Sequence, residues 1–291
     1  MQIVFALVAL VVGFVLLVKG ADWFVEGSAG IANKFGIPQI VIGLTIVAMG
    51  TSMPEAAVSI SAALRGSAEI TIGNVVGSNI MNILVILGLT AVVCQIAVQK
   101  TTIHYEIPMV IGVTILLAVM GLQNNIISRA EGVILLACMV VYMLYLLRLA
   151  KRGVVENEEM DAYAKQVSFG RLILLVVVGV AAIIFGSHVA VEAASAIARI
   201  FGISERFIGL TIVAFGTSLP ELVTSVAAAR RGNSDIAVGN IVGSNLFNIM
   251  FVVGITAVIV PVVYQPTFGW TALWRLRQRC FFWYVFTAEG F

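Results

Sequence analysis

The chain carries little charge, and this limits the class of protein to which it can belong. Only 11% of its 291 residues are charged and 60% are hydrophobic, whereas soluble domains average about 25% charged residues. Apolar runs of about 20 residues recur and are continuous rather than alternating, which indicates transmembrane helices and not a β-barrel. The net charge of +2 does not indicate a nucleic-acid partner. The composition predicts an all-α polytopic membrane protein, embedded in a lipid bilayer.

Residues typical of catalytic and soft-metal sites are also scarce. The three cysteines, Cys94, Cys138 and Cys280, lie far apart without the spacing of a metal site, and the chain has two histidines. It contains no HExxH, GxSxG or GxGD sequence. We therefore expect neither an enzyme nor a resident cofactor, and nothing in the sequence predicts an obligatory protein partner.

The apolar runs divide the chain into about eight spans and one long polar connection. The spans cover residues 2–26, 39–64, 70–94, 105–122, 127–149, 170–198, 206–229 and 236–263. The connection, residues 151–169, is rich in acids and links a first half, residues 1–150, to a second half, residues 170–264. The last segment, residues 265–291, has an apolar run that is broken by arginines and too short to span. We expect an atypical tail, for which truncation, a frameshift and an interfacial segment all stay open.

One segment of the chain occurs twice. Residues 43–90 and 209–256 are identical at roughly 27 of 48 positions, without insertion or deletion. The same offset of 166 residues pairs Gly20 with Gly186, so the first span of each half corresponds as well. Basic residues gather at one set of span ends, which predicts an outside amino terminus and a cytoplasmic linker 151–169 in the cell inner (plasma) membrane. Because the first half has five spans, the second copy is inserted in the opposite orientation, and the repeat is inverted.

Each copy places a glutamate beside a helix-breaking proline near mid-span. Pro54 lacks an N–H and clashes with the carbonyl four residues earlier, so the helix should kink and free carbonyls from Ala48 to Gly50. Glu55 follows, and Glu221 repeats it in the second copy. A carboxylate at the bilayer centre is costly unless compensated, and the repeated cores offer no Lys or Arg partner. Glutamates, hydroxyls and carbonyls form an all-oxygen set, which suits a hard cation such as Ca²⁺ or Na⁺.

The span after each glutamate carries a polar stripe. Its members are spaced by four residues: Asn74, Ser78 and Asn82 in the first copy, and Asn240, Ser244 and Asn248 in the second. Intramembrane Ser, Thr and Asn also serve as hydrogen-bonding groups between helices. For Asn79 and Asn245, which lie off the stripe, we favour that interpretation. Four further polar residues lie near span ends and are interpreted as interfacial: Asp22, Glu26, His188 and Glu192.

The doubled sequences GTSMPE with GNVVGSNIMN and GTSLPE with GNIVGSNLFN resemble the calcium/cation antiporter superfamily, in particular its prokaryotic Na⁺/Ca²⁺ exchanger branch. The resemblance covers about residues 1–264 and implies a 5+5 pattern of transmembrane helices, with ligand helices at about 39–94 and 206–263. The implied metal ligands are Ala48 (carbonyl), Thr51, Ser52, Glu55, Ser78 and Asn82, and Ala214 (carbonyl), Thr217, Ser218, Glu221, Ser244 and Asn248. Some members carry an aspartate at the position of Asn82 or Asn248. Because both positions are asparagine here, the only formal negative charges among the implied ligands are those of Glu55 and Glu221.

This resemblance implies a secondary active antiporter that exchanges Ca²⁺ for Na⁺ by alternating access at a midplane site. An H⁺/Ca²⁺ (cation/proton) exchanger is the alternative, because protonation of either glutamate can replace Na⁺ binding. A cation channel and a non-functional truncated homologue are alternatives of other classes. The sequence does not distinguish Na⁺ from H⁺ coupling.

Overall fold

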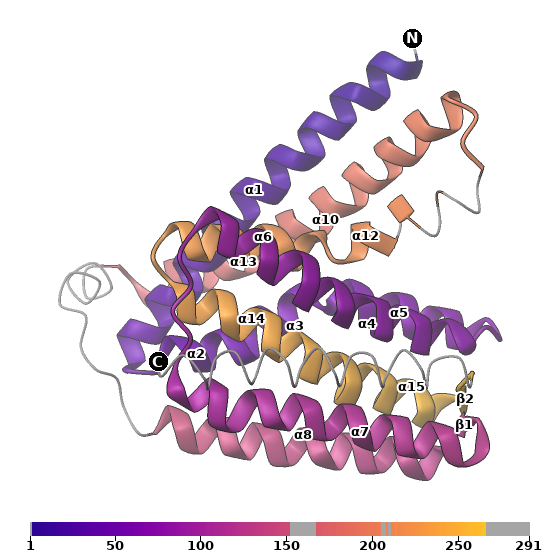
Figure 1. The fold of residues 1–291 in the computed structure, drawn as a ribbon. Helices are drawn as coiled ribbons and strands as arrows, with labels where there is room; N and C mark the ends of the chain where they lie inside the picture. The colour runs from indigo at the N-terminus through magenta and orange to yellow at the C-terminus, as the bar shows by residue number, and fades with distance from the viewer. Residues whose placement is uncertain (1, 152–166, 205–207, 209–210, 213, 266–291) are drawn as a thin grey trace.

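The computed structural model describes residues 2–151, 167–204, 208, 211–212 and 214–265, and these are almost entirely helical (Figure 1). Several spans include a π-helical segment, written η. The first half contains α1 (Gln2–Phe35), α2 (Gln39–Ile42), η1 (Gly43–Val47), α3 (Ala48–Thr51), α4 (Met53–Leu64), α5 (Glu69–Met81), η2 (Asn82–Ile86), α6 (Leu87–Val93), η3 (Thr102–Glu106), α7 (Ile107–Asn124), β1 (Ile126–Ile127) and α8 (Arg129–Ala150). The second half contains α10 (Phe169–Ile200), α12 (Ala214–Thr217), α13 (Leu219–Arg230), α14 (Ser234–Phe247), η5 (Asn248–Val253), α15 (Gly254–Ile259) and β2 (Val262–Val263).

The described residues contain six helices that are long and apolar enough to cross a membrane, and a bent helix pair that makes a seventh. This confirms a polytopic helical membrane protein. The predicted span 206–229 falls partly outside the described residues, and so does the predicted tail from residue 266 onward. The predicted first span, 2–26, ends too early. Helix α1 continues to Phe35 and stops before Gly36, whose φ of +61° is a typical helix C-terminal conformation.

Helices α1 and α10 run antiparallel and lie side by side, leaning away from the other helices (Figure 1). Glycines allow the two backbones to touch. A Cβ on Gly13 would lie 2.7 Å from the backbone nitrogen of Ala190, and a Cβ on Gly20 would lie 2.9 Å from the carbonyl oxygen of Gly179. Contacts between small residues of this kind are typical of helix pairs in membranes. The equivalent first helices of the two halves therefore form one tightly packed pair.

Helix α14 lies in the centre of the bundle, against the broken span of the first half (Figure 1). Two of its glycines make the approach possible. A Cβ on Gly239 would lie 2.9 Å from the Cα of Gly43, and a Cβ on Gly243 would lie 2.7 Å from the Cβ of Ala48. This contact places the second-half polar stripe directly beside the helix break of the first half.

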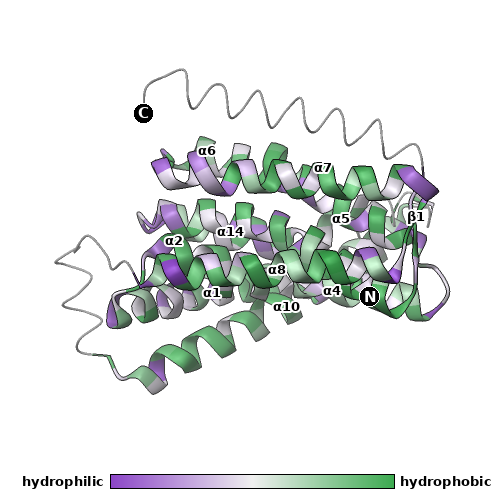
Figure 2. Ribbon diagram, turned by 90° about the horizontal axis from the view of Figure 1, so that it is seen from below, coloured by the Kyte–Doolittle hydropathy of each residue, from purple (hydrophilic) through white to green (hydrophobic). Residues whose placement is uncertain are grey.

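Helices α7 and α8 cover one side of the bundle, and a short antiparallel pair of strands joins them to the second half. Ile126 pairs with Val263 and Ile127 with Val262. Helix α8 presents exposed Val133, Val140 and other large apolar side chains, and Figure 2 shows hydrophobic residues along α8 and α10. Such a surface suits lipid rather than water.

Candidate ion-binding site

In each half, one helix is interrupted just before the residue that precedes the proline and the glutamate. Ser52 separates α3 from α4, and its backbone (φ −85°, ψ 7°) matches that of Ser218 before α13 (φ −90°, ψ 1°). The first break bends the span by 44°, which confirms the predicted kink. Pro54 and Pro220 occupy the first turn of the following helices, where no intrahelical N–H bond is lost. Both glutamates therefore lie at the start of a helix, where the helix dipole stabilises a carboxylate.

Glu55 and Glu221 are fully enclosed by protein, with exposed fractions of 0% and 1%. One oxygen of each accepts a hydrogen bond: Ser52 Oγ donates to Glu221 Oε1 at 2.8 Å, and Ser78 Oγ donates to Glu55 Oε1 at 3.3 Å. The second oxygen of each carboxylate, Oε2, is buried without a hydrogen-bond partner. Within the described part of the chain, no Lys, Arg or His forms an ion pair with either group. Because an unpaired buried carboxylate is costly, a bound cation or proton is the expected compensation.

Three more of the predicted ligands have a buried oxygen that lacks a hydrogen-bond partner among the described residues. They are Asn82 and Asn248, through Oδ1, and Ser218, through Oγ. With the two carboxylate oxygens they form a set drawn from both halves, and every member is a hard oxygen ligand of the kind that Ca²⁺ accepts. No group of three or more His, Cys, Asp or Glu side chains that could hold a metal occurs in the described ranges. Amide and hydroxyl oxygens must therefore complete any cation site here.

The first-half residues Ala48 and Thr51 are held by hydrogen bonds to the second half. The hydroxyl of Thr51 lies 2.9 Å from Asn240 Oδ1, and Ser244 Oγ donates to the carbonyl of Ala48 at 3.4 Å. This carbonyl also accepts the backbone N–H of Ser52 at 3.1 Å. The prediction that the break frees it is wrong, because the helical bond from residue 52 persists and the bend begins after it. A ligand role for Ala48 stays a prediction.

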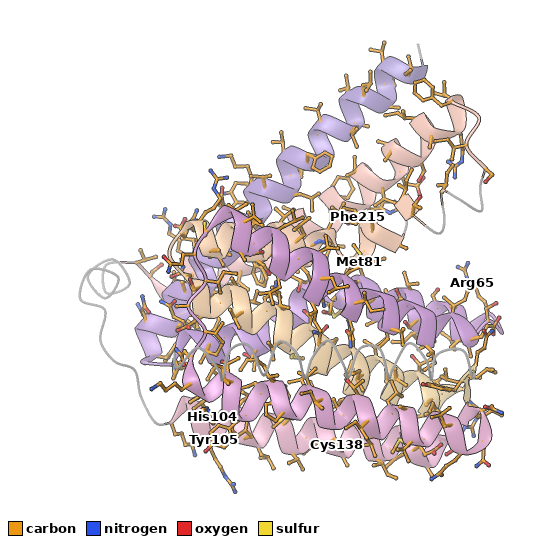
Figure 3. All side chains as sticks on the ribbon, viewed as in Figure 1. Arg65, Met81, His104, Tyr105, Cys138 and Phe215 are labelled. Atoms are coloured by element: carbon orange, nitrogen blue, oxygen red, sulfur yellow. The ribbon has the colours of Figure 1, made fainter. Side chains whose placement is uncertain are left out.

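The second-half counterparts, Ala214 and Thr217, are more open. Thr217 Oγ1 donates to the carbonyl of Ala214 at 3.2 Å, and Ala214 is exposed. Ala214 lines a cavity of about 610 Å³, together with Ser78 of α5 and Phe215 of α12. Figure 3 shows Met81, which also lines it, and Phe215 near the gap between α5 and α12. By contrast, Ala48 and Thr51 have exposed fractions of 0% and 1%. The cavity thus reaches the predicted ligands Ser78 and Ala214, whereas Ala48, the equivalent of Ala214, is closed off by α14.

The first asparagine of each stripe holds a glutamate-bearing helix in place. Asn74 Nδ2 donates to the backbone carbonyl of Glu55 at 3.1 Å, and Asn240 Nδ2 donates to that of Glu221 at 3.3 Å. Each amide makes a second bond, to Ser59 Oγ at 3.0 Å or to the Oγ of Ser225 at 2.9 Å. The two serines were not singled out from the sequence, although the same offset of 166 residues relates them.

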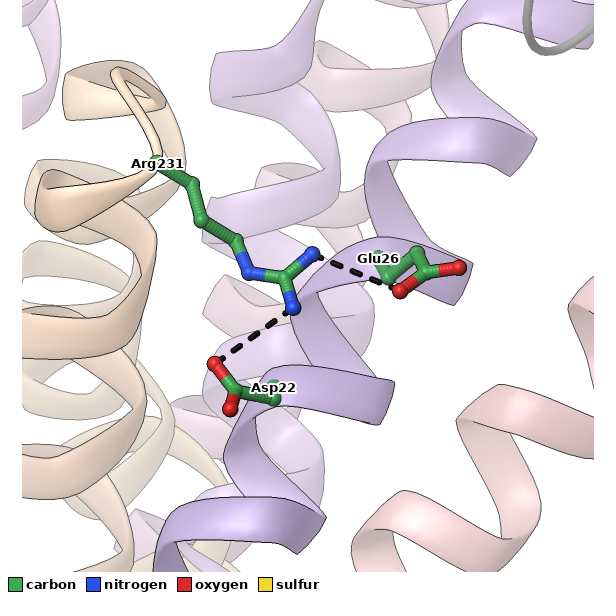
Figure 4. Close-up of polar contacts among 3 residues, drawn as sticks. All are labelled: Asp22, Glu26 and Arg231. Carbon is green, nitrogen blue, oxygen red and sulfur yellow. Dashed lines mark hydrogen bonds and ion pairs between the residues drawn. The ribbon is translucent and has the colours of Figure 1, made fainter.

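An ion-pair cluster lies outside the site, where Asp22 and Arg231 line a second cavity of about 570 Å³. Arg231, just after α13, lies 3.4 Å from a carboxylate oxygen of Asp22 and 3.4 Å from one of Glu26, both on α1 (Figure 4). These side chains are between 27% and 37% exposed. Because α1 continues to Phe35, Asp22 and Glu26 lie within the helix and not at its end, and their interfacial location stays a prediction. The cluster joins α1 to the end of the helix that carries Glu221.

Glu106 is a third buried acid that the sequence analysis did not single out. Its exposed fraction is 0%, it accepts a hydrogen bond from the hydroxyl of Tyr145, and its Oε2 has no partner among the described residues. It lies at the end of η3, between α7 and α8, and not with the glutamates of the two breaks. It was not identified because it lies at the edge of the predicted span 105–122. An intramembrane acid is nonetheless a signal that could have found it.

Comparison with known proteins places this geometry in a family. A family model described as "Sodium/calcium exchanger protein" matches residues 5–148 and 171–288, and so includes most of the segment set apart as a tail. The chain is 33% identical to the sodium/calcium exchanger MaX1 of Methanosarcina acetivorans, over 87% of this chain and 82% of that protein. It is 38% identical to the inner membrane protein YrbG of Escherichia coli, over 88% and 81%.

The fold also matches solved structures of the sodium-calcium exchanger NCX_Mj. For one soaked with 10 mM Na⁺ and 10 mM Sr²⁺, the TM-score is 0.83 at 32% identity, covering 97% of this chain and 90% of that one. The family match extends over both halves of the chain. The chain belongs to the sodium/calcium exchanger family, whose members are transporters rather than enzymes.

Proposed function

We propose that this protein exchanges Ca²⁺ for Na⁺ across the cell inner membrane, at a site between Glu55 and Glu221. One observation supports this most: two buried carboxylates, one from each half, have unpaired oxygens and form no ion pair with a cationic side chain among the described residues. Asn82, Asn248 and Ser218 add neutral oxygens to the same set.

The two negative charges determine which combinations of cations neutralise the site. One Ca²⁺ neutralises both carboxylates, and two Na⁺ do so equally well. Because the same oxygens serve both ions, Ca²⁺ and Na⁺ cannot fill the site together, and this competition couples their movement. Two protons would also neutralise the carboxylates. An H⁺/Ca²⁺ exchanger is therefore the other outcome of the test.

The packing supports alternating access. The cavity reaches Ser78 and Ala214, whereas α14 closes over Ala48 and Arg231 holds α1. Helices α1 and α10 contact each other through glycines, with few interdigitating side chains. We therefore expect this pair to be the element that moves relative to the other helices. With the amino terminus outside and the linker 151–169 in the cytoplasm, the cavity opens outward and the Arg231 cluster lies on the inner side.

Transport in proteoliposomes tests this function. We expect ⁴⁵Ca²⁺ uptake driven by an outward Na⁺ gradient, and its loss in Glu55→Gln and in Glu221→Gln, because each substitution keeps the shape of the side chain and removes one charge. Glu69→Gln, at an exposed position at the start of α5, is the matched control and should transport normally. Uptake driven by a pH gradient and not by Na⁺ would establish proton exchange instead. Unchanged uptake in both glutamate variants would remove these residues from the site.

A further inference from the structure

Asn82 and Asn248 pose a problem of orientation that a carboxylate does not. Each side-chain amide has an oxygen on one side and an NH₂ group on the other, and the two sides have almost the same shape. Only the oxygen can bind a cation. Both side chains are buried, with exposed fractions of 1% and 0%, so water cannot correct a wrong orientation. Something in the protein must set which side faces the ion.

Asn79 sets the orientation of Asn248 through a short chain of hydrogen bonds. The backbone carbonyl of Asn245 can only accept, and it receives Asn79 Nδ2 at 3.2 Å. Asn79 must therefore turn its oxygen the other way, where it accepts Asn248 Nδ2 at 3.1 Å. This uses the NH₂ group of Asn248 and leaves its Oδ1 buried without a hydrogen-bond partner in the described structure.

Asn245 makes the corresponding bond to Asn82, although among the described residues only the chain through Asn79 ends on a backbone carbonyl. Asn245 Oδ1 accepts Asn82 Nδ2 at 3.2 Å, and Asn82 Oδ1 is likewise left buried and without a partner among the described residues. The relation is crosswise. Asn79 and Asn245 occupy equivalent places in the two copies, yet each holds the stripe asparagine of the opposite half. Asn79 and Asn245 are themselves fully buried, at 0% and 2% exposed.

We infer that Asn79 and Asn245 are positioning residues for the transported cation: they hold the amides of Asn248 and Asn82 with the oxygen toward the site. This rests on the proposed function, and it assigns to the two residues more than a role in holding helices together. The groups that orient metal ligands commonly matter by about 10- to 100-fold in affinity. We therefore expect Asn79→Leu, which keeps the size and removes the amide, to weaken Ca²⁺ binding by about tenfold or more.

A double-mutant cycle separates positioning from simple packing. An aspartate has two equivalent oxygens and no wrong orientation, so Asn248→Asp removes the need for Asn79. In the Asn248→Asp background, Asn79→Leu should change the Ca²⁺ dissociation constant by less than about threefold. In the Asn82→Asp background its full cost of about tenfold or more should remain, because Asn82 is held by Asn245. Binding of ⁴⁵Ca²⁺ to the purified full chain is the measurement, with thermal melting as the check on folding.

The outcomes are distinct. Rescue by Asn248→Asp and not by Asn82→Asp supports the proposal; equal costs in both backgrounds, or wild-type affinity in Asn79→Leu itself, overturn it. If Asn79→Leu does not fold, the mirror cycle with Asn245→Leu applies, where only Asn82→Asp should rescue. Wild-type protein that binds no Ca²⁺, or Ca²⁺ binding that persists in Glu55→Gln and Glu221→Gln, overturns the proposed function and the positioning role with it. Normal wild-type binding with a failed cycle overturns the positioning role alone.

Discussion

Replacing Arg231 by glutamine should favour movement of α1 away from the end of α13. Arg231 is the cation that joins both Asp22 and Glu26 of α1 to the end of α13, at 3.4 Å each. Glutamine keeps much of the length of the side chain and removes its charge, so both ion pairs are lost together. The adjacent Arg230 is exposed and forms no ion pair among the described residues, which makes Arg230→Gln a control of equal charge.

The expected magnitude is modest, because the cluster is partly solvated. The three side chains are 27% to 37% exposed, and ion pairs in such places contribute about 0.3–1 kcal/mol each. Two pairs sharing one arginine therefore stabilise the closed arrangement by about 1 kcal/mol, which corresponds to a roughly fivefold change in the population of the open state. High salt should reduce this difference, since screening weakens partly exposed pairs.

A cysteine reporter makes the change measurable. Ala228 of α13 has an exposed fraction of 0% and belongs to a buried cluster that includes residues of α1, so Ala228→Cys should react only when this packing opens. In a background without the native cysteines, a membrane-impermeant maleimide applied from the linker side should label Ala228→Cys roughly fivefold faster when Arg231→Gln is present. Equal labelling rates in Arg231→Gln and Arg230→Gln would show that the ion pairs do not hold α1 against the end of α13.

Two further predictions follow from the packing. Gly186→Val should destabilise the protein by about 1–3 kcal/mol in thermal unfolding, because its Cβ would lie 2.8 Å from the carbonyl oxygen of Gly13. Gly170→Val is the control and should have little effect, because no described atom lies within 4 Å of its Cβ position. Equal losses of stability in the two variants would contradict the role of the α1–α10 contact. Glu106→Gln should leave Ca²⁺ affinity within about twofold of wild type, because the amide oxygen can still accept from Tyr145 and the residue lies outside the site. A tenfold loss of affinity in Glu106→Gln would mean that it acts on the ion.

The local chemistry of the site could be predicted from sequence because it depends on short-range rules. A proline beside a glutamate in an apolar span specifies both a break and a buried acid, and the bend at Ser52 and the burial of Glu55 follow. The spacing of Asn74 and Asn82 likewise specifies one face of a helix. Glu106 was overlooked because it stands at the edge of a predicted span, and the boundaries of spans are what hydropathy defines least well.

The crosswise contacts of Asn79 and Asn245 could not be predicted, because they depend on how the two halves pack. Both residues lie off the polar stripe, and the sequence favoured a role in contacts between helices. They do make such contacts, since each is hydrogen-bonded to the opposite half. Their effect on the orientation of Asn248 and Asn82 needs the direction of each bond. No pattern of spacing contains that information.

The two copies differ in structure although they share the same glycine, proline and glutamate motif, and the proposed transport would use this difference. Gly243 packs against Ala48, so closely that a Cβ would lie 2.7 Å from that of Ala48. Their equivalents in the other copy are Gly77 and Ala214. Gly77 has no described atom within 4 Å of its Cβ position, and both residues line the cavity. Because the contacting glycine and alanine are the same in both copies, we expect the closed contact and the open one to be close in free energy and able to exchange places. An inverted repeat makes that exchange equivalent to moving the opening from one side of the membrane to the other.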